Sequence, residues 1–226
     1  KTKPHRLFFE SLKLQLEKAG YSLTEKLLNS LQFGVPQDRD RIFLFGSLRK
    51  HGLSTTSKFQ WELAAPYTRD EAFGFSWPAT SAFGAIPPKA DVPLELTISH
   101  WFKKNRVEKH PNSTHVFQAR AGLSKFLVIA EGDDSRKSYK RLHRYRYSPT
   151  VAYGNNEVHL HPWLPRRLTV AEALSLQSLP KEFALPPDMT LSAMFKTIGN
   201  GVPYLMGKGV ANAIASHVIN VGVAKQ

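Results

Sequence analysis

The sequence predicts an α/β protein whose two ends build one domain and whose middle forms an inserted, mainly β domain. Two observations lead to this prediction. Amphipathic helix and strand patterns occupy both ends of the chain, whereas the middle holds clustered prolines, frequent aromatic residues and only short strand-like runs. Helix and strand patterns that share one core are typical of an α/β domain. We therefore expect boundaries that divide the chain into residues 1–47, 48–162 and 163–226.

The first range predicts a helix followed by a strand. Within residues 5–19, Phe8, Leu12 and Leu16 recur at the spacing of one helix face, and Gly20 is a typical residue at a helix end. This apolar face predicts that the helix packs on another element. Residues 21–31 follow as a strand.

The stretch FGVPQDRDRIFLFGS comes next and alternates charged and uncharged side chains. Because alternate side chains of an extended chain share a face, we expect Gln37, Arg39 and Arg41 on one face, with residues 42–45 entering a core. Planar donors on a buried strand suit hydrogen bonds to a base edge or a phosphate. A solvated strand edge with alternating charge is the alternative.

The middle range contains three runs with strand-like composition, residues 97–102, 115–120 and 125–131, after a proline cluster between Pro87 and Pro93. These runs are the basis for expecting a mainly β insertion.

A basic stretch, RKSYKRLHRYRY, occupies residues 136–147 and contains three tyrosines and no acidic residue. Cations interleaved with aromatic rings suit contacts to nucleic-acid phosphates and bases. A solvated basic loop is the alternative. The cations expected to contact DNA are Arg136, Lys137, Lys140, Arg141, Arg144 and Arg146.

His159 and His161 lie two positions apart and would share a strand face, a spacing that also suits a metal-binding pair. Neither a cysteine nor a pair of carboxylates stands nearby, so we expect structural or surface histidines and no metal site.

Two patterns organise the C-terminal range. In residues 166–180, Thr169 and Glu172 have the spacing of a capping box, which predicts a helix start. In KTIGNGVPYLMGKGVA, residues 196–211, glycines flank Asn200, and Pro203 suits the start of a further helix. Such glycines permit positive φ or close approach of a ligand. The stretch is therefore either a ligand-binding turn or an ordinary tight turn.

The composition restricts the function. The 31 Lys and Arg against 18 Asp and Glu give a net charge of +13 and favour a polyanionic partner, although a merely soluble basic protein would also fit. No apolar run has the length of a membrane span, so we expect a soluble, intracellular protein without a membrane partner. The absence of cysteine excludes disulfides, Cys-ligated zinc and thiol catalysis by these residues.

Taken in order, FGVPQDRDR, a long irregular insert, RRLTVAEALSLQSLP and KTIGNGVP resemble the C-terminal half of the DNA (cytosine-5) methyltransferase family, as do FSWPATSAFGAIPP and SPTVAYGNN within the insert. The resemblance implies part of a Rossmann-like catalytic domain with an inserted target-recognition domain. It further implies methyl transfer from S-adenosylmethionine to carbon 5 of a cytosine flipped out of duplex DNA, in the setting of restriction-modification. A bacterial source would imply a cytoplasmic, nucleoid-associated protein.

The resemblance also assigns roles to residues. Arg41 is similar to the family arginine that reaches the flipped cytosine, Arg39 to its neighbour that supports the catalytic loop and phosphate, and Gln37 completes the triplet. Thr150 resembles a threonine that contacts the DNA backbone. The turn over the methyl donor corresponds to Asn200, Gly201 and Val202, with Gly201 where the family often has Ala or Ser, and Leu179 stands where it often has Phe.

The family's glycine-rich donor loop, its Pro-Cys nucleophile and its Glu-Asn-Val segment precede the stretch that this sequence matches. The chain opens on Lys1 and has no cysteine, so we expect a fragment or one subunit of a split enzyme, inactive alone and completed by the missing N-terminal half. A DNA-binding or regulatory protein without chemistry is the alternative from another class. Methylation of transfer RNA is disfavoured by the long insert.

Overall fold

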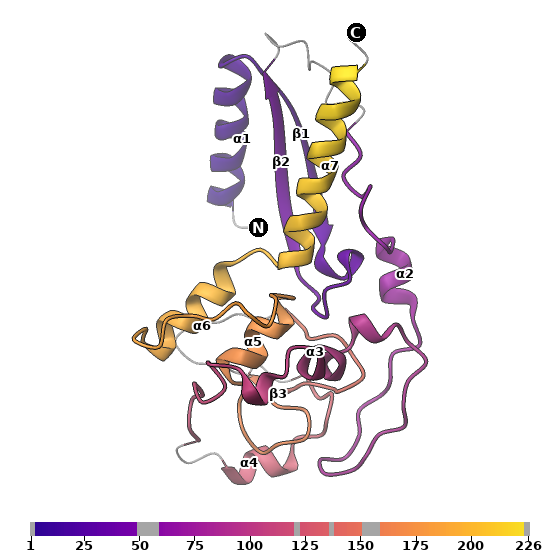
Figure 1. Cartoon of the computed structure of the whole chain (residues 1–226), viewed down its shortest axis with the longest axis vertical. Coiled ribbons are helices and arrows are strands. Elements are labelled where there is room, and N and C mark those ends of the chain that lie inside the picture. Colours follow the sequence, from indigo (N-terminus) through magenta and orange to yellow (C-terminus); the bar gives the residue numbers. More distant parts are fainter. Residues whose placement is uncertain (1–2, 49–58, 120–122, 136–137, 151–158, 224–226) are drawn as a thin grey trace. The chain divides into compact units, whose positions relative to one another are not determined.

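The structure is a computed structural model that describes residues 3–48, 59–119, 123–135, 138–150 and 159–223 (Figure 1). The chain forms two compact units. The first comprises Lys1–Leu28, Asp40–Ala65 and Lys208–Gln226, and the second comprises Asn29–Arg39 and Pro66–Gly207. No helix within the described ranges is long and apolar enough to cross a membrane.

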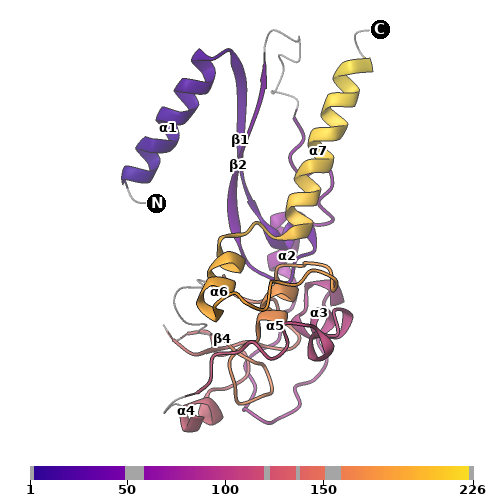
Figure 2. The same cartoon turned by 60° about the vertical axis from the view of Figure 1, so that its left-hand side comes forward.

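The first unit is built on a two-stranded sheet of β1 (Tyr21–Asn29) and β2 (Asp40–Leu48). Helix α1 (Lys3–Lys18) lies on one side of this ribbon, and α7 (Tyr204–Val223), most of which belongs to this unit, lies on the other (Figures 1 and 2). The predicted first helix and strand are thus confirmed.

Aromatic side chains join β2 to α7 in this unit. Phe45 stacks on Phe59 with 4.5 Å between ring centroids, and His217 of α7 meets the Phe45 ring edge-on at 5.7 Å. Residues 42–45 are only partly buried, so their predicted entry into a core is realised in part.

The second unit contains short elements around several apolar clusters. These are η1 (Ser30–Phe33), α2 (Arg69–Gly74), η4 (Leu94–Leu96), α3 (Ile98–Lys104), η5 (Val107–Lys109), α4 (Leu123–Val128), β3 (Lys140–Arg141), β4 (His159–Leu160), α5 (Val170–Leu176) and α6 (Leu191–Asn200). Strands β3 and β4 pair in parallel.

The prediction of a mainly β middle was wrong for the residues that the structure describes. Residues 97–102 hold most of α3, because Ile98, Trp101 and Phe102 are buried at the spacing of a helix face. Residues 125–131 hold most of α4, where Phe126 is buried. In the run 115–120, an isolated bridge at Val116 is the only strand pairing among the described positions.

The C-terminal elements pack with the middle of the chain. The predicted capping box is confirmed, since Thr169 accepts from the Glu172 N–H and the Glu172 side chain accepts from the Thr169 N–H. Leu168, Ala171 and Leu176 around α5 share a buried cluster with α3. This shared core explains why the second unit runs across the predicted boundary between residues 162 and 163.

Helix α6 was not predicted. Thr190 caps it, and Met194, Phe195 and Ile198 bury one face in a cluster with α5. The sequence carried this signal, an N-cap threonine before apolar residues at helical spacing, but the glycines around Asn200 favoured a turn.

Candidate functional site

Residues 36–39 and 148–150 run side by side within the second unit. Gln37 and Ser148 form a parallel bridge, with the Asp38 N–H donating to the Ser148 carbonyl at 2.8 Å and the Ser148 N–H donating to the Pro36 carbonyl at 2.8 Å. The Thr150 hydroxyl donates to the Asp38 carbonyl. Two segments far apart in the sequence therefore pair along their backbones, and Gln37 and Ser148 are buried where they meet.

The start of the second unit folds back on this segment. The Ser30 N–H donates to the Arg39 carbonyl at 3.0 Å, and the Asn29 amide donates to an Asp38 carboxylate oxygen at 2.7 Å. Gly34 permits the sharp reversal because its φ is 77°, a left-handed conformation that favours glycine.

Arg39 connects this segment to the end of α6. Its side chain is 2% exposed, and its Nη2 donates to the Gly199 carbonyl and, at 3.3 Å, to the Gly201 carbonyl. The glycines beside Asn200 do not use the positive φ that they permit, because Gly199 and Asn200 are helical and Gly201 has φ −65°. The stretch is a helix end held by a buried guanidinium, rather than a free tight turn.

Gln177 and Ser178 join the same cluster from the end of α5, and the sequence reasoning missed both. The Gln177 amide donates to the Gln37 side chain at 3.4 Å, and its carbonyl accepts from the Tyr204 N–H at 2.9 Å. The Ser178 hydroxyl accepts from the Leu205 N–H at 3.1 Å. Polar residues within the apolar SLQSLP stretch were the available signal, since buried polar groups need partners.

Gln37 and Arg39 are buried, and the Gln37 amide nitrogen has no hydrogen-bond partner among the described residues. Their contact to a base edge or phosphate stays a prediction. Arg41 differs, because it lies in β2 of the first unit and is only partly buried. Its Nη1 donates to the Asp40 carbonyl at 2.9 Å, and burial lowers the pKa of its guanidinium.

Arg141 corrects part of the expected DNA-contacting set. It is fully buried and donates to the carbonyls of Phe126, Ile129, His161 and Leu164. Burial lowers the pKa of its guanidinium to about 10. A cation enclosed by backbone carbonyls organises the surrounding loops and does not face a phosphate.

Arg144 also has a protein partner. It forms an ion pair of 2.7 Å with Glu131, which is buried, and this hydrogen-bonded carboxylate raises the pKa of Arg144. Lys140 and Arg146 are partly exposed. Arg136 and Lys137 lie outside the described residues.

The histidine pair is buried rather than at the surface. His161 Nδ1 accepts from the Leu164 N–H at 3.1 Å, and its Nε2 lies 3.5 Å from Glu172, which Arg166 grips at 2.6 and 2.8 Å. Burial, together with nearby arginines, lowers the pKa of His161 well below its ordinary value. His159 pairs through the backbone with Lys140.

The chain belongs to the C-5 cytosine-specific DNA methylase family, whose sequence pattern matches residues 1–216. DNA methylation by a methyltransferase is thus the chemistry of its family.

Among its relatives, the Type II methyltransferase M.NmeDI of Neisseria meningitidis serogroup C is 55% identical over 221 residues, covering 97% of this chain and 52% of the relative. M.AplI of Arthrospira platensis, also a Type II methyltransferase, is 27% identical over 215 residues, covering 93% of this chain and 52% of the relative. The chain therefore spans about half the length of the curated relatives it matches.

Solved structures share the fold. A structure described as a DNA modification methyltransferase encoded within an E. coli prophage superposes with a TM-score of 0.61 at 18% identity, covering 92% of this chain and 64% of that one. The S. pombe Dnmt2 methyltransferase gives a TM-score of 0.52 at 15% identity, covering 93% and 62%. These likenesses support a mixed helix and strand methyltransferase fold.

Proposed function

We propose that this chain supplies the DNA-reading part and the donor-closing turn of a DNA (cytosine-5) methyltransferase. The enzyme transfers a methyl group from S-adenosylmethionine to carbon 5 of a flipped cytosine in duplex DNA. The observation that carries the proposal is the convergence, within one unit, of residues 37–39, the segment ending at Thr150 and the end of α6 at residues 199–201.

The turn has the chemistry for a ligand with polar and apolar edges. Asn200 is exposed at the end of α6, and Val202 is 46% exposed beside it. A Cβ added at Gly201 would lie 3.4 Å from the Ile198 carbonyl oxygen, so the Ala or Ser that the family resemblance implies at this position would also fit. S-adenosylmethionine, when bound, supplies the methyl group, and in this proposal Asn200, Gly201 and Val202 line part of its site.

We assign the remaining roles in this proposal, which include the contacts with DNA, to four groups of residues. Arg41 is proposed to hold the flipped cytosine by charge-assisted hydrogen bonds, and Arg39 to position the donor turn through the Gly199 and Gly201 carbonyls. Thr150 is exposed and suits a backbone contact. The proposed phosphate-contacting cations are Lys140, Arg146, Arg136 and Lys137.

The proposal assigns the nucleophile to polypeptide outside these 226 residues, because attack on carbon 6 of cytosine needs a thiolate and the sequence has no cysteine. We further propose that residues 48–162 act as the target-recognition domain, although their described core is helical and irregular.

The test is transfer of labelled methyl groups to duplex DNA. The purified chain alone should transfer none, and the chain combined with a polypeptide carrying the donor loop and Pro-Cys segment should form 5-methylcytosine. Transfer by the chain alone would refute this division of roles. Duplex binding without transfer in the combined protein would favour a DNA-binding or regulatory protein.

A further inference from the structure

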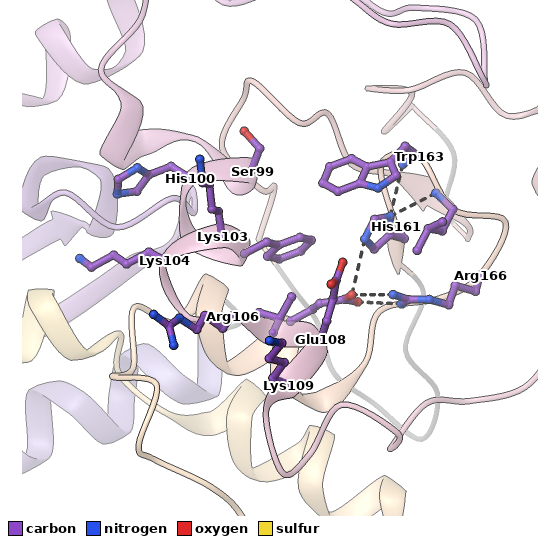
Figure 3. A pocket seen from close by; sticks show the side chains of 14 residues that line it. Ser99, His100, Lys103, Lys104, Arg106, Glu108, Lys109, His161, Trp163 and Arg166 are labelled. Atoms are coloured by element: carbon purple, nitrogen blue, oxygen red, sulfur yellow. Dashed lines mark hydrogen bonds and ion pairs between the residues drawn. The ribbon is translucent and has the colours of Figure 1, made fainter.

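We propose that a second surface of this chain, an open pocket between α3, η5, the segment after β4 and α5, binds the sugar-phosphate backbone of DNA. The inference rests on the proposed DNA binding and adds a contact surface to it. The pocket has a volume of about 900 Å³ and lies wholly in the second unit (Figure 3). No residue of the family resemblance was assigned a role there.

The rim of the pocket carries an excess of positive charge. Lys103, Lys104, Arg106 and Lys109 are exposed, and Glu108 is the only exposed carboxylate among the lining residues. Within the described part of the chain, none of these four cations has an ion-pair partner. Lys104 instead lies over the Trp101 ring, with its Nζ 4.2 Å from the centroid. The rim therefore presents uncompensated cations to solvent.

Arg106, one of these rim cations, has a strained backbone conformation. Its φ and ψ are 48° and 50°, a left-handed conformation that is strained for a residue with a side chain. Neighbouring hydrogen bonds maintain it, since the Lys109 N–H donates to the Arg106 carbonyl at 2.9 Å and Asn105 anchors the turn to the Leu179 carbonyl at 2.8 Å. Glycine would adopt this conformation freely, so an arginine here suggests a use for its charge.

The floor of the pocket combines a paired carboxylate with an aromatic ring. The Glu172 carboxylate is neutralised by the bidentate contact with Arg166, so it does not repel an anion strongly. Trp163 is 36% exposed and is held edge-on by His161 at 4.4 Å, with the Arg144 guanidinium 5.0 Å from the ring centroid. A fixed indole beside cations offers an apolar wall for a sugar and donors for its phosphates.

These features match a phosphodiester chain better than a single small anion. The cations line a pocket of about 900 Å³, whereas one phosphate would need convergent donors around a small cavity. The net charge of +13 adds a long-range attraction toward DNA.

The first test compares two triple charge reversals that change the net charge equally. The rim variant reverses three of the four rim cations by Lys103→Glu, Arg106→Glu and Lys109→Glu. The control variant reverses three exposed lysines elsewhere in the same unit by Lys89→Glu, Lys125→Glu and Lys181→Glu. The Kd for a labelled duplex is measured across a salt series. The rim variant should bind at least about tenfold more weakly than the control near 150 mM salt, with a salt slope lower by roughly two to three.

The outcomes separate this inference from the proposed function. Equal losses of duplex affinity in the two triple variants would overturn the proposed role of the pocket and would leave the proposed DNA binding of the chain standing. If the parent chain bound no duplex, both proposals would be overturned. A lysine-acetylation footprint gives a second readout, in which duplex should protect Lys103 and Lys109 but not Lys89. Protection by an acidic protein and not by duplex would likewise overturn the proposal.

The variant Arg106→Gly tests whether Arg106 binds DNA or has only a structural role. Glycine should raise the Tm by relieving the backbone, yet weaken duplex binding by removing the cation. Unchanged binding in this variant would assign Arg106 to the fold alone.

Discussion

Arg39 carries the connection on which the candidate site depends. Its buried guanidinium links two segments 160 residues apart by donating to the Gly199 and Gly201 carbonyls. A buried charge is stable only when its donors are matched, so the turn and the arginine stabilise each other.

Replacing Arg39 with Met should therefore destabilise the second unit. The two carbonyls would lose a charged donor, and we expect about 2–4 kcal/mol of unfolding free energy to be lost. Arg39→Lys should recover part of it, because one ammonium can reach one carbonyl. Urea unfolding measures the change, with Lys196→Met on the exposed face of α6 as the control. If the urea midpoint of Arg39→Met equalled that of the control, the contact of Arg39 with the two carbonyls would not contribute to stability.

The basic stretch at residues 136–147 contains both a buried cation and cations that reach the surface. Arg141→Met should cost about 3–5 kcal/mol, because four backbone carbonyls lose their donor in a buried place. Lys140→Met, its partly exposed neighbour, should change stability by less than about 1 kcal/mol and weaken duplex binding instead. Thermal melts with duplex titrations check this, and the reverse pattern would return Arg141 to the DNA-contacting set.

The segment around His161 should make the fold sensitive to acid. Because the folded pKa lies well below the ordinary value, the unfolded chain binds the proton more readily. Stability is therefore fully present above about pH 6.5 and declines as the pH falls below it, by up to about 1.4 kcal/mol per pH unit for this group. The groups facing the ring are Glu172, already paired with Arg166, and the cations Arg141 and Arg144.

His161→Asn keeps an acceptor for the Leu164 N–H and removes the titration. Its unfolding free energy should fall less steeply than that of the parent between about pH 6.5 and pH 5. Identical slopes in urea unfolding across this range would contradict the assignment.

Elements with a local signal were predictable, and those decided by tertiary burial were not. The capping box of Thr169 and Glu172 is written in four consecutive residues, and the structure contains it. Residues 97–102 also fit a strand by composition. Only the burial of Ile98 and Phe102 against α5 decides for a helix, and sequence spacing alone does not reveal that partner.

The same limit applies to the site. Motif order predicted roles for Gln37, Arg39 and the residues around Asn200, and these stay predictions. It did not predict that Arg39 donates to the Gly199 and Gly201 carbonyls. Long-range hydrogen bonds depend on how segments meet in space, which a linear pattern does not encode. The roles of Gln177 and Ser178 were missed for the same reason.

At the scale of the whole molecule, the chain spans about half the length of the curated relatives it matches. The methyltransferase activity is therefore proposed for the complete enzyme. We propose that the QDRDR segment serves methyl transfer rather than general DNA attraction. Arg41 is the residue that separates these two uses, because it is partly exposed and its Nη1 donates to the neighbouring Asp40 carbonyl.

The most direct measurement is single-turnover methylation by the combined enzyme carrying Arg41→Ala or Arg41→Lys, alongside duplex affinity and a thermal melt. A charge-assisted bond made chiefly in the transition state is worth about 2–4 kcal/mol, or roughly thirty- to a thousandfold in rate. We expect that loss in both variants with nearly unchanged duplex affinity, because an ammonium does not reproduce the planar guanidinium. Near-parental turnover in either variant, or a loss explained wholly by weaker DNA binding or unfolding, would contradict the account.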